Sequence, residues 1–291
     1  MMQQLETKTF QRLNVGINSR MIKEVSNGPI FSEEVDLIEV GIGESGVLKN
    51  GEIDRTRLNE FSTLRNKYSV HGPFTFNHDY YGNAVNLGVK SNRNFEIMTE
   101  VFEIADYLDA EHVVMHGDRV ETEYREAFQN IVANLKQLCK MAAEYNITVL
   151  IENVHKEKKN DRIGILPHEI QQVIRAVNEE NLKFCFDIGH GTLAANQFGF
   201  DILDFVSMLS PYLAHMHIHD NMGIPEVVDE KLGDQHLPLG QGKVEVTRIF
   251  DAVSRLGVKN TVLELRPKAG RREALKSVAA LRVLQCKMAR H

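Results

Sequence analysis

The chain has 291 residues, of which 43% are hydrophobic and 25% are charged. This is an ordinary globular composition with enough length for a large core. The net charge of -6 gives no overall basic bias toward nucleic acid or an anionic membrane, although a local basic patch stays open.

The cysteines and the N-terminal segment bear on the compartment. Cys139, Cys185 and Cys286 are odd in number and far apart in sequence, so we expect no disulfide framework and a reducing compartment. Residues 1–20 lack a continuous apolar stretch, so no signal peptide is expected. No run approaches the roughly 20 apolar residues of a membrane helix. We therefore predict a cytoplasmic protein without a membrane partner.

Short β-type runs alternate with helical patterns along the chain. The predicted strands are Leu13–Ile17, Asp36–Val40, Tyr68–His71, His112–His116, Thr148–Asn153, Lys183–Asp187, Ala214–His219 and Thr261–Leu265. The predicted helices are Arg55–Asn66, Asn92–Leu108, Thr122–Tyr145, Pro167–Asn178, Asp201–Met208, Val246–Leu256 and Arg271–Arg290. This alternation indicates parallel strands with crossover helices. Eight such units predict one α/β domain over residues 1–291, a (β/α)8 TIM barrel.

Polar residues of metal-ligand type lie near the ends of six of these apolar runs. The set is His71, His116, Glu152, Asp187, His190, His217, Asp234, His236 and Glu264. Burying such a group without a partner costs several kcal/mol, of order 2–7 even for a neutral one. A barrel brings the carboxyl ends of its strands together on one axis, where its active site is built. The pattern therefore predicts a metal site at that end.

The strand that ends at His219 carries three histidines at alternate positions, His215, His217 and His219, which share one face. A metal binds neutral imidazole and offsets nearby carboxylates, and His217 is the expected ligand. We interpret His215 as a hydrogen-bonded core histidine. In the preceding strand Asp187 has two readings, a ligand paired with His190 after a turn at Gly189, or the cap of a following helix.

Two glutamates, Glu152 and Glu264, end strands on opposite parts of the barrel. Such a pair suits proton transfer, in which one carboxylate takes a proton from a carbon while the other returns one. A metal acidifies that carbon by polarising the neighbouring carbonyl or hydroxyl. The simpler alternative is an ion pair between Glu264 and Arg266.

Loops carry further signals. Asp234 and His236 are two residues apart, so an extended backbone aims both the same way, although an ordinary turn with an exposed histidine is the alternative. Residues 156–159 read Lys-Glu-Lys-Lys, which is typical of a solvated loop and less so of a phosphate contact. The long loop Thr75–Ser91 contains Tyr80 and Tyr81, which either shape a substrate pocket or pack within the loop.

Several motifs together resemble the xylose isomerase-like TIM-barrel superfamily. They are Val70-His71-Gly72-Pro73, Ile151-Glu152-Asn153, Phe186-Asp187-Ile188-Gly189-His190, His217-Ile218-His219-Asp220-Asn221 and the segment from Asp234 to Gly242. The relevant branches are the sugar phosphate isomerase/epimerase proteins and the endonuclease IV family of abasic-site nucleases.

The two branches imply different chemistry. The epimerase branch implies one divalent ion, often manganese, held by Glu152, Asp187, His217 and Glu264, with both glutamates as acid/base residues. Substrate hydroxyls would be held by His190 and Arg266, and His219 joins them as a candidate substrate contact. The nuclease branch implies three zinc ions on the nine-residue set named above.

Three departures weigh against the nuclease. Where that family typically reads Asp-Thr-Cys-His, this chain has Asp187-Ile-Gly-His190. Where it reads His-Leu-Asn-Asp followed by a Ser/Ala-Lys pair, this chain has His217-Ile-His-Asp220 and no lysine directly after it. Where it reads Asp-Arg-His, this chain has Asp234-Gln-His236 and no arginine. DNA affinity rests largely on cationic contacts to phosphate. We therefore predict an isomerase or epimerase acting on a sugar or sugar phosphate with one to three zinc or manganese ions. A nucleic-acid partner belongs only to the alternative, and a homo-oligomer stays open.

Overall fold

The structure is a computed structural model that describes residues 13–74, 82–117 and 119–288. Eight parallel strands close into a barrel in the order β1-β10-β9-β8-β7-β6-β5-β2. Their bounds are β1 Asn14–Asn18, β2 Leu37–Gly41, β5 Lys67–His71, β6 His112–His116, β7 Thr148–Glu152, β8 Leu182–Asp187, β9 Leu213–Ile218 and β10 Asn260–Leu263. The predicted α/β class and the (β/α)8 barrel are confirmed.

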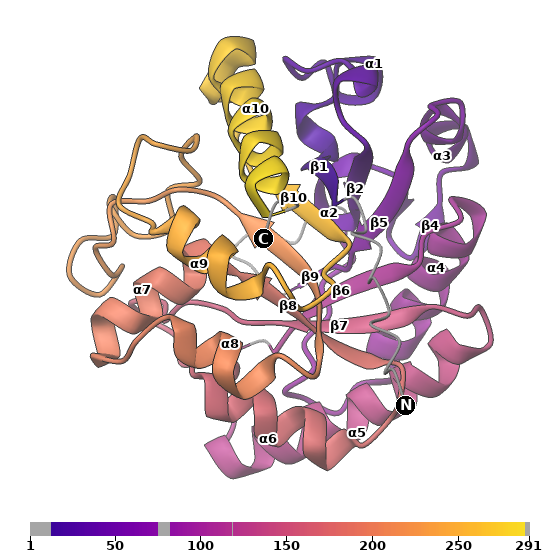
Figure 1. The fold of residues 1–291 in the computed structure, drawn as a ribbon. Helices are drawn as coiled ribbons and strands as arrows, with labels where there is room; N and C mark the ends of the chain where they lie inside the picture. The colour runs from indigo at the N-terminus through magenta and orange to yellow at the C-terminus, as the bar shows by residue number, and fades with distance from the viewer. Residues whose placement is uncertain (1–12, 75–81, 118, 289–291) are drawn as a thin grey trace, which may run out of the picture.

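Helices surround this barrel, as Figure 1 shows. The longer ones are α3 Arg55–Ser62, α4 Asn92–Tyr107, α5 Tyr124–Ala143, α6 Pro167–Val177, α7 Ile188–Phe198, α8 Leu203–Leu209, α9 Val246–Val253 and α10 Gly270–Met288. Every predicted helix is present within a few residues of its expected bounds. In the described residues no helix has the length and apolar character needed to cross a bilayer.

The β8–α7 junction differs from the prediction. We expected a turn at Gly189, but β8 passes directly into α7 because Asp187 caps that helix, accepting a 2.7 Å hydrogen bond from the backbone N–H of His190. Asn153 holds the junction from β7, since its amide donates to the Asp187 carbonyl at 2.8 Å and its Oδ1 accepts the Asp187 N–H at 2.9 Å. His190 therefore reaches the barrel mouth from the first turn of a helix.

Smaller elements that the prediction missed lie in the first quarter of the chain. They are η1 Ser19–Met21, α1 Lys23–Ser26, η2 Ser32–Glu34, α2 Ile42–Ser45, and the two-stranded sheet of β3 Leu48–Lys49 and β4 Glu52–Ile53. They are too short for the periodicity of an amphipathic helix or strand to be recognised. The short η4 Pro267–Ala269 follows β10.

The long connection between β9 and α9 is closed at its base by Asp220 (orange in Figure 1). One carboxylate oxygen of Asp220 accepts the N–H groups of Gly240 and Gly242 at 2.9 and 2.8 Å, and the other accepts that of Val244 at 3.0 Å. The Asp220 backbone also pairs with Leu237 in both directions. The segment that carries Asp234 and His236 therefore begins and ends at one fixed point.

Candidate metal and active site

The strand-end residues predicted from the sequence lie at the carboxyl end of the barrel. Four of them are the last residues of their strands, namely His71, His116, Glu152 and Asp187. His217 is the penultimate residue of β9, and Glu264 directly follows β10. His190 comes from α7, and the loop after β9 supplies Asp234 and His236.

Glu152 lies at the centre of the group and is 0% exposed. Its Oε2 lies 3.3 Å from Nε2 of His71 and 3.2 Å from Nε2 of His116. Its Oε1 lies 3.3 Å from Nδ1 of His190 and 3.4 Å from Nδ1 of His217. Oε1 is buried without a hydrogen-bond partner among the described residues. One carboxylate thus faces four imidazoles.

His217 lies between three carboxylates. Its Nδ1 is 3.3 Å from Glu264 in addition to the Glu152 contact, and its Nε2 is 2.9 Å from Oε1 of Glu39. Sequence reasoning missed Glu39, which is 1% exposed and also lies 3.4 Å from His215. The available signal was a glutamate between isoleucine and valine inside an apolar strand.

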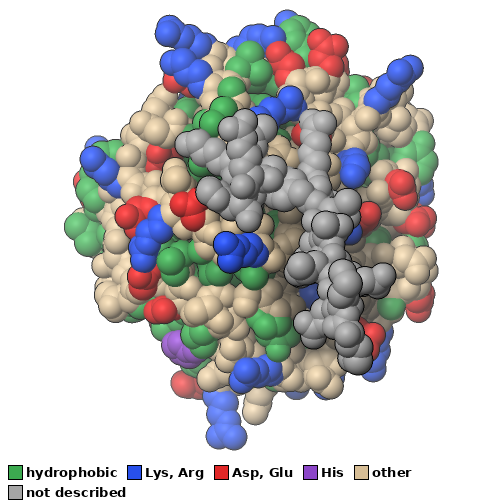
Figure 2. All heavy atoms as spheres, viewed as in Figure 1, with side chains coloured by type: hydrophobic (Ala, Val, Ile, Leu, Met, Phe, Trp, Pro, Cys, Tyr) green, Lys and Arg blue, Asp and Glu red, His purple; other side chains and the backbone are tan. Residues whose placement is uncertain are grey.

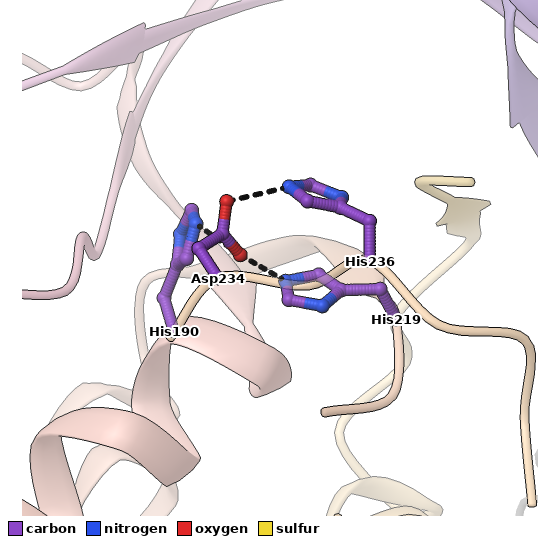
Figure 3. A group of neighbouring side chains, drawn as sticks. All are labelled: His190, His219, Asp234 and His236. Atoms are coloured by element: carbon purple, nitrogen blue, oxygen red, sulfur yellow. Dashed lines mark hydrogen bonds and ion pairs between the residues drawn. The ribbon is translucent and has the colours of Figure 1, made fainter. Parts of the chain in front are cut away.

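A second group surrounds Asp234, whose carboxylate lies between His190 on one side and His219 and His236 on the other (Figure 3). Asp234 Oδ1 is 3.7 Å from Nε2 of His190 and 3.5 Å from Nε2 of His219. Asp234 Oδ2 is 2.8 Å from Nε2 of His236. The rings of His219 and His236 stack with centroids 4.1 Å apart. We call these four residues the Asp234 group.

In most of these imidazoles one ring nitrogen faces a hydrogen-bond acceptor whose position is fixed by the fold. Nδ1 faces a backbone carbonyl in His71 (Gly72, 2.9 Å), His190 (Asn153, 3.1 Å), His236 (Glu264, 2.9 Å) and, more loosely, His219 (Asp220, 3.4 Å). In His217 the Glu39 carboxylate lies 2.9 Å from Nε2, an ion-pair contact without hydrogen-bond geometry. Each carbonyl fixes the ring proton on Nδ1 and leaves Nε2 as the nitrogen available to a cation, the arrangement of histidines that bind metals. In His190 the held Nδ1 is also the nitrogen nearest Glu152, so the available Nε2 faces Asp234 instead.

The distances and the unpaired atoms fit a divalent ion. Two ligand atoms about 2.1 Å from one ion at a tetrahedral angle lie about 3.4 Å apart. The two contacts of His217 Nδ1, with Glu152 at 3.4 Å and with Glu264 at 3.3 Å, are close to this value. The groups whose ligand atoms lie within 4.8 Å of one another include His71–Glu152–His217, Glu39–His217–Glu264 and Glu152–Asp187–His190. Buried atoms without a hydrogen-bond partner among the described residues include Glu152 Oε1, Asp187 Oδ2, His217 Nδ1, His219 Nε2 and Asp234 Oδ1. Such atoms are costly unless something else binds them.

The carboxylates of the cluster also raise the pKa values of three of its imidazoles. Burial opposes protonation of His71, but the Glu152 carboxylate outweighs it and raises the pKa of His71 to about 9. Burial likewise opposes protonation of His190 and His217, and neighbouring acidic groups outweigh it, so both pKa values are raised well above the usual range. The carboxylates thus hold protons on imidazoles that a divalent cation would displace.

His116 behaves differently. Burial lowers its pKa to about 3, although its Nε2 contacts the same Glu152 oxygen as His71. Its outer nitrogen, Nδ1, faces the guanidinium of Arg162 at 3.1 Å. Arg162 was not recognised from the sequence. It pairs with Glu157, which is 7% exposed, so the expectation of a fully solvated charge run at residues 156–159 is wrong at its second residue.

A cavity of about 420 Å³ opens above the cluster. Its walls include Arg20, Glu39, His71, His116, Arg162, His190, Asp234, His236, Glu264 and Arg266. Glu152 and His219 are 0% exposed and are not among the described residues that line it. Arg266 donates to the Asp234 carbonyl at 2.8 Å, so its recorded partner is the loop rather than the Glu264 carboxylate of the alternative interpretation. Tyr80 and Tyr81 lie outside the described residues.

Comparisons with known proteins agree with this architecture. The family model described as "Xylose isomerase-like TIM barrel" matches residues 34–284. The Uncharacterized protein MJ1311 of Methanocaldococcus jannaschii is 26% identical over 207 residues, which span 68% of this chain and 65% of that protein.

Solved structures show the same fold at lower identity. A D-tagatose 3-epimerase-like protein superposes with a TM-score of 0.76 at 22% identity, over 95% of this chain and 98% of that one. The IOLI protein with a binding zinc atom superposes with a TM-score of 0.68 at 17% identity, over 95% and 98% of the two chains. Because the family model covers most of the sequence, the chain belongs to the xylose isomerase-like TIM barrel family.

Proposed function

We propose that the chain is a divalent-metal-dependent isomerase or epimerase that moves a proton next to the carbonyl of a sugar or sugar phosphate. The observation that carries this proposal is the pair Glu152 and Glu264, which face one another across Nδ1 of His217 at 3.4 and 3.3 Å. The cavity above them lies in the size range of small-molecule sites. Epimerases among the structural neighbours add support for this class.

Four residues would hold the central ion, namely Glu152, Asp187, His217 and Glu264. Each has an atom suited to the task, and three of these atoms, in Glu152, Asp187 and His217, are buried without another partner in the described chain. Zinc and manganese both accept such nitrogen and oxygen donors. The ion would polarise the carbonyl or hydroxyl of the substrate and so acidify the adjacent carbon.

The two glutamates are not equivalent in the site. Glu264 lines the cavity and its side chain is 12% exposed, so it can exchange a proton with a bound sugar directly. Glu152 is fully enclosed by four imidazoles, and its role as the second acid/base is tied to holding the ion. His190 and Arg266 line the cavity and would hold substrate hydroxyls.

His219 fits a different role from the predicted substrate contact. It is 0% exposed, and its Nε2 faces Asp187 at 3.3 Å and Asp234 at 3.5 Å. We assign it to the Asp234 group, whose ligand-type atoms lie within 4.8 Å of one another and suit a second ion. His71, His190, Asp234 and His236 keep their proposed place in a metal centre of more than one ion.

Deuterium exchange tests the proposal without knowledge of the true substrate. A panel of ketoses, aldoses and their phosphates is incubated in D2O with the manganese- or zinc-loaded protein, and deuterium on the carbon next to the carbonyl is read by mass spectrometry. We expect incorporation that requires the metal and is lost in Glu264→Gln. The control Glu230→Gln alters an exposed carboxylate that is not among the described residues lining the cavity and keeps exchange.

The Asp234 group favours a second candidate, a three-zinc phosphoesterase that acts on abasic DNA, because it provides ligands beyond a single-ion site. Figure 2 shows Lys, Arg, Asp and Glu side chains interspersed on the described part of one face. The basic residues that the nuclease family carries after the strand of His217 and in the late loop are absent from Asp220–Met222 and Asp234–His236, which weighs against a DNA surface at this site. Cleavage of an abasic-site duplex by protein with about three zinc ions per chain, without deuterium exchange, would overturn the isomerase proposal in favour of this one.

A further inference from the structure

A buried arginine contacts one histidine of the cluster at the ring nitrogen that points away from Glu152. Arg162 is 6% exposed, and its Nη2 lies 3.1 Å from Nδ1 of His116. A guanidinium has donors and no acceptor, and it stays charged in proteins. The contact therefore has one direction, in which Arg162 donates and Nδ1 of His116 accepts.

The position of Arg162 is built into the fold. Residues Arg119 and Arg162 form an antiparallel bridge between the connections that follow β6 and β7. The approach is so close that a Cβ on Gly117 would meet the Ile163 carbonyl at 2.1 Å. Glu157 balances the charge, lying 2.8 Å from Arg119 and 3.6 Å from Arg162. Arg162 is thus a fixed donor rather than a flexible surface side chain.

This contact gives His116 the opposite tautomer from its neighbours. Since Nδ1 must accept, the ring proton of a neutral His116 lies on Nε2, which faces Oε2 of Glu152 at 3.2 Å. His71 contacts the same oxygen, but its Nδ1 faces a carbonyl, so its inner Nε2 is the nitrogen that presents a lone pair once a cation displaces its proton. A metal ligand must present a lone pair, which His116 in this arrangement does not.

We propose that Arg162 is a positioning residue that makes His116 a hydrogen-bond donor to Glu152 instead of a metal ligand. The role rests on the proposed function, in which Glu152 holds the ion and moves a proton. It also sets the stoichiometry of the centre. The position between His71 and His116 stays without an ion of its own, so the centre holds at most two, one at Glu152–His217–Glu264, which His71 adjoins, and one at the Asp234 group.

The tautomer is measured directly in the zinc-loaded protein with 15N-labelled histidine. We expect His116, assigned by the signal missing from His116→Gln, to show a protonated Nε2 and a bare Nδ1. A zinc-bound Nε2 with a protonated Nδ1 would overturn the proposal. Elemental analysis supplies an independent readout, because glutamine retains a donor for Glu152. His116→Gln should keep the zinc content of the wild type, and loss of one ion per chain would contradict the assignment.

Arg162→Met tests the cause, with Arg119→Met as the matched control that disturbs the same Glu157 but not His116. In Arg162→Met the His116 ring is released, and we expect one additional zinc ion per chain at saturation, whereas Arg119→Met keeps the wild-type number. An unchanged content in a folded Arg162→Met would count against the proposal. If that variant does not fold, the wild-type tautomer and His116→Gln decide. Neither the tautomer of His116 nor the zinc content depends on sugar turnover. A failure of the isomerase proposal would therefore be seen separately, as missing deuterium exchange.

Discussion

The two sides of Glu152 use similar residues in different ways. On one side His116 is held at Nδ1 by the side chain of Arg162 and faces Glu152 with Nε2. On the other side lies the Asp234 group, where His190 and His236 are held at Nδ1 by backbone carbonyls and face Asp234 with Nε2. A carbonyl leaves the inner nitrogen free to bind a cation, whereas a guanidinium leaves it protonated. The comparison teaches that the group behind an imidazole, and not the imidazole alone, decides whether a histidine in such a cluster serves as a ligand.

The change expected to have the largest effect removes the carboxylate that both sides share. Glu152→Gln takes the negative charge from the centre of four imidazoles, and it removes a proposed ligand and proton carrier. We expect turnover to fall by about 10²–10⁴-fold and the metal content to fall with it. Steady-state rates and elemental analysis measure both, with the exposed Glu230→Gln as control. Full metal content together with turnover within twofold of the wild type would refute the central role of Glu152.

Asp234→Asn tests whether the two proposed metal positions bind their ions independently. Its carboxylate is the common partner of His190, His219 and His236, and an amide is a much poorer ligand. We expect loss of one zinc ion per chain at saturation, while the ion at Glu152–His217–Glu264 is retained. Elemental analysis after dialysis measures the number. Loss of every ion would mean that the two positions are not independent, and no change would remove the Asp234 group as a metal site.

Glu39→Gln alters the group behind His217. Its carboxylate lies 2.9 Å from Nε2 and fixes the tautomer that turns Nδ1 toward Glu152 and Glu264. Loss of such a partner typically weakens metal affinity by about 10–100-fold. Competition with a chelator measures the affinity, and Glu44→Gln, on the cavity rim, serves as control. An affinity unchanged within a factor of two would show that Glu39 does not orient His217.

The smallest expected effect concerns the free energy of unfolding of the metal-free protein. His71 and His116 should contribute to its pH dependence in opposite directions. The pKa of His71 is raised to about 9, so its stabilising contribution is complete below pH 6.5 and is lost as the pH rises toward 9. The pKa of His116 is lowered to about 3, so its contribution is present above pH 6.5 and is lost as the pH falls toward 3.

Thermal unfolding across this range measures the difference. His71→Gln should flatten the alkaline limb of the stability curve, and His116→Gln should flatten the acid limb. If both variants flattened the same limb of the stability curve, the opposite protonation states assigned to His71 and His116 would be contradicted.

The sequence predicted the barrel because its strands and helices are long enough to show their periods, and it predicted the cluster because polar residues end apolar runs. Sequence could not predict Glu39 or Arg162. Glu39 lies on a strand that pairs with β1 and β5, far along the chain from His217, and only barrel closure brings them together. Arg162 is aimed by a contact between two loops, which no local pattern encodes.

Helix α7 was missed for a related reason. Asp187 is both its cap and a member of the cluster, and the sequence analysis treated these readings as alternatives. One oxygen accepts the His190 N–H, whereas the other, Oδ2, is buried without a hydrogen-bond partner in the described chain. A carboxylate has two oxygens, so a structural and a chemical role are compatible at one residue.

The clamp formed by Asp220 has a consequence for how this protein can change. Because the clamp joins residue 220 to residues 237–244, the intervening segment behaves as a closed loop. This loop is also tied to the connection after β7 at Glu226, which lies 3.1 Å from His155 and accepts the backbone N–H of Lys158. Each doubling of such a loop costs only about 0.6 kcal/mol in closure entropy. The exposed stretch at residues 227–231 is therefore where new surface can be inserted while Glu226, Asp234 and His236 keep their places.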